Sequence, residues 1–430
     1  MAFVHDTDKK IVIIVGSGFA GLNAAKKLAT NPDVVVLLFD QRNYHLFQPL
    51  LYQVATAGLN PADIAVPIRA QFSQARNVQV HLGQVIAVDL QRSRLTLAES
   101  HTEFGYDYLV LACGAQHSYF GHAEWENFAP GLKTLEQATE IRRRILLAFE
   151  HAENEFDEQR QQEYLTFVVV GGGPTGVELA GAIADISRTV LVNDFKRIDP
   201  TQAKVILLEG GPRLLSSFSE KLSERTRCDL RELGVDVRTS AMVERIDGES
   251  VSVAGQIVRA RSVFWAAGVQ AAKLNIAPNV ETDHAGRIVV KDDLSIPGFA
   301  GAFAIGDMAA ARSSDGTLVP GLAPAAVQMG KHVAKVIGAC IQGSTPQPFR
   351  YVDKGQLATI GRNKAVMQTG KLQLGGRLAW LAWLLVHVFY LIGFKNRIAV
   401  MAVWAWSYLR SKRGSRLIAE PGWKLRDSDR

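Results

Sequence analysis

The sequence contains little cysteine, no recognisable secretory signal and no uncharged apolar run of 20 residues. Its three cysteines, Cys113, Cys228 and Cys340, are far apart and odd in number, which argues against a disulfide framework and against a Cys-x-x-Cys redox or zinc site. The first ten residues, MAFVHDTDKK, lack the apolar core and small-residue cleavage site of a signal peptide. We therefore expect a protein of the reducing interior of the cell.

The chain is longer than one hydrophobic core usually supports, and its positive charge is concentrated at one end. With 430 residues, of which 47% are hydrophobic and 21% charged, it is typical of a globular protein with two or more domains. The formal net charge is +6, but residues 371–430 carry 11 Lys plus Arg and 3 Asp plus Glu, which gives 11 − 3 = +8. The basic character therefore belongs to this tail, which also holds five of the seven tryptophans.

A glycine-rich turn near the N-terminus has the order of a dinucleotide-binding unit. KKIVIIVGSGFAGLNAAKKL reads as a strand, a turn with Gly16, Gly18 and Gly21, and a helix, and the next strand, VVVLLFD, ends in Asp40. In this order the first glycine permits the tight turn, the second lets the backbone approach a pyrophosphate, and the third lets helix and strand pack closely. The helix N-terminus offers N–H groups to the phosphates, and Asp40 is placed to accept from a ribose hydroxyl.

The same pattern occurs a second time. YLTFVVVGGGPTGVELAGAI contains Gly171, Gly173 and Gly176, and AKVILLEGG supplies a strand that ends in Glu209. Glu209 follows Gly176 by 33 residues, where about 20 is usual, so we expect LVNDFKRIDPTQ to form a surface excursion. An acid at this position favours NADH, because its charge would repel the 2′-phosphate of NADPH.

Each copy is followed by a later strand that ends at a small-residue turn. YLVLACGA reaches Gly114, 98 residues after Gly16, and SVFWAAGV reaches Gly268, 97 residues after Gly171. Matched intervals of this kind indicate a duplicated unit. The sequence therefore predicts two bound dinucleotides.

A third motif follows the second copy. In IPGFAGAFAIGDMAAA an apolar strand, 303–305, runs into Gly306 and Asp307, and VPGLAPAAVQMGKHVAKVIGACI then reads as an amphipathic helix with Pro324 in its first turn. Gly-Asp alone is compatible with an ordinary turn. The dipole at the start of the helix stabilises a negative charge, such as the one that a flavin acquires on reduction.

Together these features resemble the flavoprotein reductases that bind two dinucleotides, and more closely the type II NADH dehydrogenases, the non-proton-pumping NADH:quinone oxidoreductases. The resemblance covers nearly the whole chain and is most specific in HLFQPLLYQVATAGL, VVVGGGPTGVELAGAI, DPTQAKVILLEGGPRLL, FAIGDMA, APAAVQMGKHVA and LVHVFYLIGFKNRIAV. It implies that FAD binds at Gly16, Gly18, Gly21, Asp40, Gln41, Gly114, Asp307, Ala325 and Ala326. It implies that NADH binds at Gly171, Gly173, Gly176, Glu209 and Gly268. No metal site is expected.

The resemblance also implies roles for one segment and two catalytic residues. The segment from His45 to Gly58 has neither helical nor strand spacing; in the family it wraps the flavin and borders the quinone, and an ordered loop without a ligand is the alternative. Glu178 would pass protons toward the reduced quinone, although acids are common in the first turns of helices. Gln328 would contact a quinone carbonyl or be an ordinary surface glutamine. Pro324 replaces the family's first glutamine and removes one of the contacts that the resemblance implies for the quinone.

The aromatic tail is expected to lie on a membrane surface without spanning it. The uncharged run 378–394 has 17 residues, fewer than the roughly 20 that a spanning helix needs. The side chains expected on one face of a first helix are Trp380, Trp383, His387, Tyr390 and Phe394, and those on one face of a second are Arg397, Met401, Trp404 and Tyr408. Aromatic rings at the headgroup level with basic groups beside anionic lipid are typical of interfacial helices. A dimer interface or buried core helices are the alternatives, and the family implies a homodimer.

The predicted fold is α/β, with two Rossmann-like domains of the glutathione-reductase type and a C-terminal amphipathic helical region for membrane attachment. We assign residues 1–120 and 291–345 to the FAD domain and 121–290 to the NADH domain. Residues 346–430 are assigned to membrane attachment and dimerisation. The charged segment from Thr139 to Tyr164 is expected to be a solvated connecting helix, with a docking surface as the alternative.

The predicted activity is electron transfer from NADH through FAD to a membrane quinone, without proton pumping, at the cytoplasmic face of the inner membrane. The expected partners are NADH, the quinone, the membrane surface and a second copy of the chain, and no nucleic acid. A sulfide:quinone oxidoreductase is the nearest alternative, but it needs cysteines beside the flavin, and of the three only Cys113 is placed for this. A flavoprotein that senses nucleotides without useful turnover is the alternative from another class.

Overall fold

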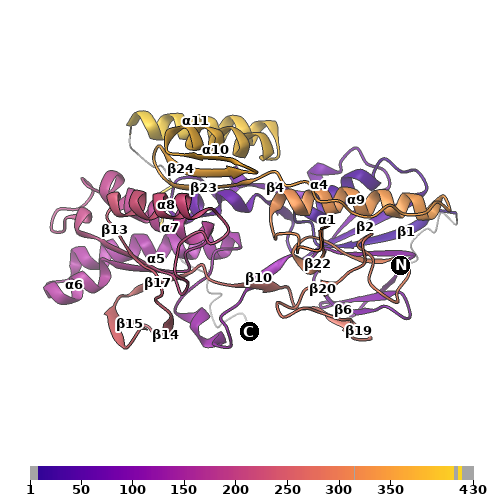
Figure 1. The fold of residues 1–430 in the computed structure, drawn as a ribbon, viewed down its shortest axis with the longest axis horizontal. Coiled ribbons are helices and arrows are strands. Elements are labelled where there is room, and N and C mark those ends of the chain that lie inside the picture. Colours follow the sequence, from indigo (N-terminus) through magenta and orange to yellow (C-terminus); the bar gives the residue numbers. More distant parts are fainter. Residues whose placement is uncertain (1–7, 314, 411–414, 419–430) are drawn as a thin grey trace, which may run out of the picture. The chain divides into compact units, whose positions relative to one another are not determined.

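The computed structural model describes the backbone of residues 8–313, 315–410 and 415–418, and their side chains except those of 394–395 and 407–410. The chain forms two compact units, each assembled from three segments (Figure 1). Unit 1 takes the residues up to Leu46, Ala65–Gln116 and Val269–Lys354. Unit 2 takes Phe47–Ile64, His117–Gly268 and the residues from Gly355 on. The predicted domain boundaries were drawn from expected ligands and stay a prediction.

Unit 1 is built around a parallel five-stranded sheet of order β21-β9-β1-β2-β5. The strands are β1 (Lys10–Val15), β2 (Val34–Asp40), β5 (Val78–Leu82), β9 (Tyr108–Leu111) and β21 (Ala302–Ala304). The central strand β1 is a β-branched run that is largely buried, as is usual for a parallel sheet covered on both faces. Helices α1 (Phe19–Leu28) and α9 (Ala323–Ile341) pack tightly on each other at Gly330. The glycine permits this approach, since a Cβ there would lie 2.1 Å from the Ala20 carbonyl oxygen.

The remaining elements of unit 1 are short. They are β3 (Tyr44–Leu46), β4 (Ala65–Pro67), α4 (Ile68–Gln71), β6 (Val85–Asp89), β7 (Arg94–Leu97), β8 (Glu103–Gly105), β19 (Asn275–Ala277), β20 (Ile288–Val289), the 3-10 turn η5 (Gly306–Met308) and β22 (Ala309–Ala310). Strands β6, β7 and β8 form an antiparallel meander. The linking strands β10 (Ala115–His117) and β18 (Val269–Ala271) pair with each other.

Unit 2 repeats this plan. Its parallel sheet consists of β11 (Thr166–Val170), β12 (Lys204–Leu208), β13 (Val235–Arg238) and β17 (Ser262–Trp265). Its order, β17-β11-β12-β13, matches β9-β1-β2-β5 of unit 1 strand by strand. A second antiparallel meander, β14 (Val243–Ile246), β15 (Ser250–Val253) and β16 (Gln256–Arg259), corresponds to β6-β7-β8. The duplication predicted from the glycine intervals is confirmed.

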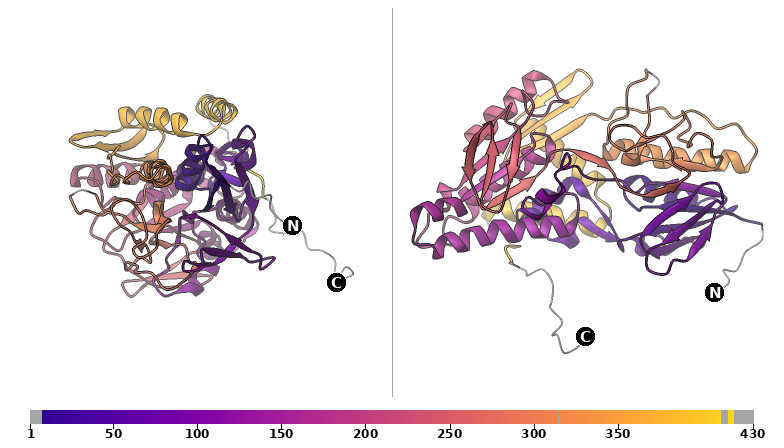
Figure 2. Two further views of the ribbon diagram at one scale, coloured as in Figure 1. Left: turned by 90° about the vertical axis from the view of Figure 1, so that its right-hand side faces the viewer. Right: turned by 90° about the horizontal axis from the view of Figure 1, so that it is seen from below.

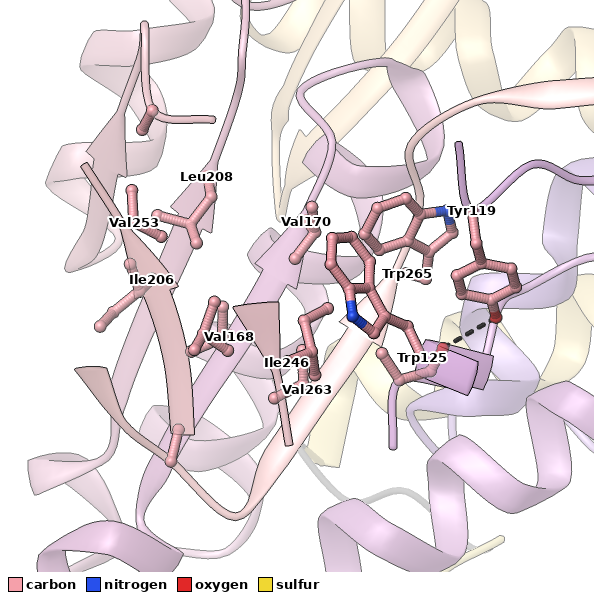
Figure 3. Packing of buried hydrophobic residues seen from close by; sticks show 14 residues of the cluster. Tyr119, Trp125, Val168, Val170, Ile206, Leu208, Ile246, Val253, Val263 and Trp265 are labelled. Atoms are coloured by element: carbon pink, nitrogen blue, oxygen red, sulfur yellow. Dashed lines mark hydrogen bonds between the residues drawn. The ribbon is translucent and has the colours of Figure 1, made fainter. Parts of the chain in front are cut away.

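The sheet of unit 2 and its meander enclose a core that is closed by aromatic side chains (Figure 3). Trp265, at the end of β17, stacks on Tyr119 with 5.1 Å between ring centroids and lies 5.7 Å from Trp125. The Tyr119 hydroxyl donates to the Ala129 carbonyl oxygen at 2.9 Å. The Trp265 indole donates to the Ser118 carbonyl oxygen at 3.0 Å. The polar groups of Tyr119 and Trp265 are therefore both hydrogen-bonded at the edge of an otherwise apolar core.

Helix α5 (Leu135–Asn154) corrects the expectation of a solvated connecting helix. Its N-terminus is capped by Thr134, which accepts from Gln137 N at 3.2 Å. One face is buried along the whole helix and comprises Ala138, Ile141, Arg142, Ile145, Leu146, Ala148, Phe149 and Ala152. Apart from the buried Arg142, the charges lie away from this face, where Glu140 pairs with Arg143 and Arg144. The high charge of the segment concealed an apolar stripe, so the helix is part of the core.

The remaining elements of unit 2 that precede its C-terminal part are helices and turns. They are η1 (Gln48–Leu50), α2 (Leu51–Ala55), α3 (Pro61–Ile64), η2 (Ala123–Asn127), α6 (Glu158–Tyr164), α7 (Pro174–Asp185), the π-helical turn η3 (Ile186–Val190), η4 (Pro200–Gln202) and α8 (Glu220–Glu232). Helix α7 contacts the C-terminal sheet backbone to backbone at Gly181. A Cβ at this position would lie 1.8 Å from the Ile360 carbonyl oxygen.

The C-terminal part of unit 2, yellow in Figures 1 and 2, is an antiparallel sheet that packs against helix α10. It contains β23 (Gln356–Gly361), β24 (Lys364–Thr369), β25 (Leu372–Gly375), α10 (Arg377–Tyr390) and α11 (Phe394–Arg410). The apolar run 378–394 is thus not one helix, because α10 ends at Tyr390. Within the part of the chain that the structure describes, no helix is long and apolar enough to cross a membrane.

Candidate functional site

The glycine turn of unit 1 joins β1 to α1. Gly16 has φ +100°, and a Cβ there would lie 2.3 Å from the Ala112 carbonyl oxygen; a Cβ at Gly21 would lie 1.8 Å from the Gly16 carbonyl oxygen. Neither position accepts a side chain. A Cβ at Gly18, in contrast, would meet no atom within 4 Å, and the start of α1 has no side-chain cap. Open space beside uncapped N–H groups fits a pyrophosphate.

Asp40 closes this turn from the end of β2. Its Oδ2 accepts from Ser17 N at 2.7 Å and from Ser17 Oγ at 2.6 Å, and its Oδ1 accepts from Arg42 N at 2.8 Å. The buried His45 ring places Nδ1 2.8 Å from the Ser17 carbonyl oxygen, and desolvation lowers the pKa of this histidine. The acid therefore fixes the shape of the loop that its predicted ligand would approach. The next residue, Gln41, is exposed.

Gly306 and Asp307 lie where the first turns of α1 and α9 meet. A Cβ at Gly306 would be 3.1 Å from the Ala20 Cβ and 3.7 Å from the Ala326 Cβ. Gly306 N donates to the Met329 sulfur at 3.1 Å. Unit 1 therefore brings together the glycine turn, the Gly-Asp pair and the N-terminus of α9. Gly114, with φ +74°, follows β9, the neighbour of β1, and Ala325 is buried in the first turn of α9.

Gln328 is engaged with the backbone of its own unit. Its Nε2 donates to the Val352 carbonyl oxygen at 2.9 Å and to the Pro324 carbonyl oxygen at 3.2 Å, and its Oε1 accepts from Val352 N at 3.0 Å. Both ends of the amide thus hold the segment that follows α9. An amide held in this way is a structural clamp, so contact with a quinone carbonyl would require at least one of these bonds to open.

The glycine turn of unit 2 has the same geometry as that of unit 1. Gly171 has φ +111°, and a Cβ there would lie 2.7 Å from the Ala266 carbonyl group; a Cβ at Gly176 would lie 1.8 Å from the Gly171 carbonyl oxygen. A Cβ at Gly173 would again meet no atom within 4 Å. The first residue of α7 is Pro174, and no side chain caps the helix. This turn also fits a pyrophosphate.

Glu209 occupies the place of Asp40. Its Oε2 accepts from Gly172 N at 2.6 Å, and its Oε1 accepts from Gly211 N at 2.6 Å. The 33-residue interval between Gly176 and Glu209 contains the π-helical turn η3 and the turn η4. Gly268, with φ +69°, follows β17, the neighbour of β11. The predicted NADH residues thus lie together in unit 2.

A pocket in unit 2 is formed by one face of α7 together with the C-terminal elements. Its lining residues are Tyr52, Gln53, Thr56, Gly58, Glu178, Ala182, Asp185, Thr359, Ile360, Gly361, Arg362, Trp380, Trp383, Leu384 and Trp404. Glu178, Ala182 and Asp185 follow helical spacing along α7, and the tryptophans come from α10 and α11. The pocket combines flat aromatic walls with a few polar groups, which is typical of a small-molecule site.

Glu178 lies in the wall of this pocket. Its carboxyl group accepts a hydrogen bond from Thr359 N at 3.4 Å, but desolvation dominates and raises the pKa of Glu178 to about 8. The group is therefore mostly protonated at neutral pH. A carboxylic acid at the surface of a pocket can donate a hydrogen bond and transfer a proton to a ligand.

Several lining residues could not be identified from the sequence. Gln53 accepts from Trp404 Nε1 at 2.8 Å and donates to the Tyr52 hydroxyl oxygen at 2.9 Å. These side chains are 351 residues apart in the chain, so no local pattern announces their contact. The segment from His45 to Gly58 did signal a site by its irregular composition, and residues from Phe47 on belong to unit 2. Its predicted contact with a flavin stays a prediction.

Part of the aromatic face expected to meet lipid headgroups is turned inward, whereas Tyr390 on the same face is 41% exposed. Trp383 is 2% exposed and stacks on His387 with 4.3 Å between ring centroids, and it lies 5.5 Å from Trp404. Burial lowers the pKa of His387 to about 4. The exposed stripe of α10 is apolar and mostly leucine, with Leu378, Leu381, Leu385 and Phe389 each at least half exposed. The Phe394 and Tyr408 side chains and Trp423 lie outside the described residues.

The cysteines do not form a redox pair. Cys113, Cys228 and Cys340 are all free. Burial raises the pKa of the Cys113 thiol to about 12, so the reactive thiolate form is suppressed. Cys228 is exposed on α8, in the other unit. The described residues thus offer no sulfur-carrying cysteine pair, and they contain no group of acidic, histidine and cysteine side chains that could hold a metal ion.

Comparisons with known proteins agree with this architecture. The pyridine nucleotide-disulphide oxidoreductase family matches residues 10–330, and the NDH2 C-terminal domain matches residues 354–413. A type II NADH:quinone oxidoreductase, Ndh, of Mycobacterium tuberculosis is 44% identical over 424 residues, 95% of this chain and 90% of that protein. A second protein of that organism, NdhA, is 41% identical over 423 residues, 95% of this chain and 89% of its own.

Solved structures share the fold. The structure of NDH2 from Plasmodium falciparum in complex with NADH has a TM-score of 0.87 at 20% identity and covers 96% of this chain and 100% of its own. The sulfide:quinone oxidoreductase of Aquifex aeolicus has a TM-score of 0.71 at 19% identity and covers 96% of each chain.

Two parallel Rossmann-like sheets, each with an open glycine turn, define an α/β reductase of the type that binds two dinucleotides. The chain belongs to the pyridine nucleotide-disulphide oxidoreductase family, and within it to the type II NADH:quinone oxidoreductases.

Proposed function

We propose that this chain oxidises NADH and reduces a membrane quinone, with FAD as its resident carrier and without proton pumping. The observation that carries the proposal is that a chain of this family contains two glycine turns of the same geometry, each open in front of its second glycine. When bound, FAD supplies the two-electron chemistry that links hydride oxidation to quinone reduction. The protein supplies binding, orientation and protons.

Each unit holds one dinucleotide in this proposal. In unit 1, the N–H groups at the start of α1 bind the FAD pyrophosphate in front of Gly18, and Asp307 lies beside the N-terminus of α9, whose dipole favours negative charge. In unit 2, the start of α7 binds the NADH pyrophosphate in front of Gly173. The carboxylate of Glu209 at the turn disfavours the extra phosphate of NADPH.

The pocket of unit 2 is the proposed quinone site. Its tryptophans offer flat surfaces for a quinone ring, and Glu178 holds a proton that it can deliver to a quinone oxygen. Gln328 belongs to unit 1, and its amide is held by Val352. We therefore assign Gln328 a positioning role that keeps the segment after α9 in place, and we retain a direct quinone contact only as a state in which that clamp opens.

The exposed stripe of α10 is the proposed membrane contact. Leu378, Leu381, Leu385 and Phe389 project from one side of the helix, and residues 371–430 carry a net charge of +8. Apolar side chains enter the acyl boundary while basic groups meet anionic headgroups, at about 1 kcal/mol per basic group near the surface. Such attachment would bring a lipid-soluble quinone to the protein. A homodimer remains part of the proposal, and sedimentation equilibrium tests it.

Alanine substitutions at the two open glycines test the cofactor assignments. A methyl group at Gly18 or Gly173 would meet no protein atom within 4 Å, so both variants should fold. We expect Gly18→Ala to lose FAD during purification, which absorbance near roughly 450 nm, the usual flavin band, measures. We expect Gly173→Ala to keep FAD but to need about tenfold more NADH for half-maximal bleaching, because its methyl group occupies the space of a phosphate.

Matched controls separate ligand binding from folding. Gly338→Ala in unit 1 and Gly248→Ala in unit 2 introduce the same methyl group at ordinary contact distances of 3.9 and 3.8 Å. Both controls should keep FAD and their NADH kinetics. A wild-type protein that is colourless and cannot be reconstituted with FAD, or whose reduced flavin is not reoxidised by a soluble quinone, would overturn the proposed function.

Vesicle sedimentation tests the membrane proposal. Leu385→Ser should weaken binding to anionic vesicles, because it removes an apolar side chain that is 74% exposed on α10. Ile257→Ser, at a site on β16 that is 68% exposed, serves as the control. Equal binding of both variants and the wild type would exclude α10 as the lipid contact.

A further inference from the structure

The pocket of unit 2 contains a hydrogen-bond chain whose direction is fixed by one side chain. Trp404 Nε1 donates to Gln53 Oε1 at 2.8 Å, and Gln53 Nε2 donates to the Tyr52 hydroxyl oxygen at 2.9 Å. All three side chains line the pocket. An indole N–H can only donate a hydrogen bond. The amide oxygen of Gln53 must therefore face Trp404, and the amide nitrogen must take the other position.

This orientation determines which kind of hydrogen bond Gln53 can offer to a ligand. The amide nitrogen carries two hydrogens, and Tyr52 receives one of them. Gln53 is half-buried in the pocket wall, so the second hydrogen can be donated to a molecule in the pocket. The carbonyl oxygen, which could have accepted from a ligand, is held against Trp404. The protonated carboxyl group of Glu178 adds a second donor to the same wall.

We propose that Gln53, oriented by Trp404, makes the pocket bind oxidised quinone in preference to the quinol product. A quinone oxygen can only accept hydrogen bonds, whereas each quinol hydroxyl also has a hydrogen to donate. At the ligand oxygen that meets Gln53, the amide donor satisfies a quinone and leaves the hydrogen of a quinol hydroxyl without an acceptor at that position, which costs binding free energy. Asp185, elsewhere in the lining, can accept a hydrogen bond. Gln53 is thus a specificity-determining residue, and Trp404 is the positioning residue that keeps its amide from turning over. The inference rests on the proposed quinone function of the pocket.

The ratio of two dissociation constants tests this selectivity. A short-chain ubiquinone and its quinol are titrated separately, under anaerobic conditions, into the FAD-loaded protein without NADH, and quenching of tryptophan fluorescence is followed. The wild type should bind the quinone more tightly. In Gln53→Leu, which removes the donor, the ratio of quinol to quinone dissociation constants should fall about three- to tenfold, the range of one net hydrogen bond.

Trp404→Phe provides an independent second variant. It keeps an aromatic ring but removes the N–H that fixes the amide, so Gln53 can turn its oxygen toward the ligand. The quinol should then bind more tightly than it binds to the wild type, and quinol product inhibition of turnover should increase. Gln256→Leu, at an exposed glutamine of β16, is the matched control and should leave both dissociation constants unchanged.

The outcomes separate this inference from the function on which it rests. An unchanged ratio in both variants, or parallel weakening of quinone and quinol, would overturn the selectivity and reduce Gln53 to a packing role. FAD content and the rate of bleaching by NADH verify that each variant is folded. If Gln53→Leu does not fold, the result for Trp404→Phe decides the test. Failure of the wild type to bind or reduce the quinone would identify failure of the proposed function before any variant is compared.

Discussion

Replacing Glu178 by Gln removes a titrating group from the pocket wall while keeping its shape. Desolvation raises the pKa of this carboxyl group to about 8 from an ordinary value of 4.5, and the hydrogen bond from Thr359 N opposes this only in part. The difference corresponds to roughly 5 kcal/mol, at about 1.4 kcal/mol for each pH unit. Because the side chain is partly open to the pocket, water reduces the effect, and we expect about 2 to 4 kcal/mol.

The sign of the effect follows from where the proton resides. Between pH 4.5 and about 8 the folded protein keeps a proton on Glu178 that the unfolded chain has released. The contribution of this group to the free energy of unfolding is therefore complete below pH 4.5 and is lost as the pH rises through about 8. Glutamine has no proton to lose. The stability of the variant should thus fall less than that of the wild type between pH 5 and pH 9.

Denaturant unfolding at several pH values, followed by tryptophan fluorescence, measures this difference. Stopped-flow reoxidation of the NADH-reduced protein by a soluble quinone gives an independent readout. Wild-type reoxidation should slow as the pH rises through about 8, whereas Glu178→Gln should be slower at pH 7 and nearly independent of pH. Parallel pH dependences of stability and of reoxidation in the two proteins would refute a raised pKa at this site.

Three further predictions follow from single contacts. Gly181→Ala should lower the free energy of unfolding by about 3 kcal/mol or more, measured in denaturant, because its Cβ would lie 1.8 Å from the Ile360 carbonyl oxygen. Glu209→Gln should raise kcat/KM for NADPH relative to NADH about three- to tenfold in steady-state assays, because it removes a charge that repels phosphate. Sulfide should not bleach the flavin, and Cys113→Ala should keep its quinone-dependent NADH oxidation within about twofold, because the thiol is buried and protonated.

The two nucleotide turns could be predicted from the sequence because they depend on local backbone geometry. Gly16 and Gly171 are needed for positive φ, and Gly21 and Gly176 are needed where any Cβ would overlap a carbonyl oxygen. These requirements act over six residues and leave a readable pattern. The equal strand orders of the two units then follow from the duplication.

Local spacing could not predict the pocket as a whole, because its walls come from five elements distributed over the chain; the segment from His45 to Gly58 and Glu178 were expected beside a quinone only from the family resemblance. Gln53 and Trp404 are 351 residues apart, and Glu178 and Thr359 are 181 apart. Gln328 illustrates the same difficulty, since its residue type fits a ligand contact, but its partner is the backbone of Val352. Residue type indicates what a side chain is able to do, and only the tertiary fold determines what it contacts.

The tail shows why spacing finds a helical face but not the direction in which that face points. Trp380 and Trp383 share the predicted face with His387, and both tryptophans line the pocket. The opposite stripe, of three leucines and Phe389, is also apolar, so hydrophobicity alone does not choose between the two. Hydrogen bonding favours the aromatic face, because the Trp404 indole on α11 donates to Gln53 of α2. The bond between His387 Nδ1 and the Trp383 carbonyl oxygen lies within α10 and does not depend on the direction of the face.

An indole N–H is costly in an environment that cannot hydrogen-bond, and that of Trp404 is satisfied inside unit 2, whereas the buried Trp383 Nε1 has no hydrogen-bond partner among the described residues. Leu381 and Leu385 have no polar atoms and can face an acyl boundary without such a cost. Turning Trp383 and Trp404 inward therefore serves two purposes at once, because it builds walls of the pocket and leaves a stripe of three leucines and Phe389 on the outside of α10. The helix that would rest on the membrane is then the same helix that would hold the quinone.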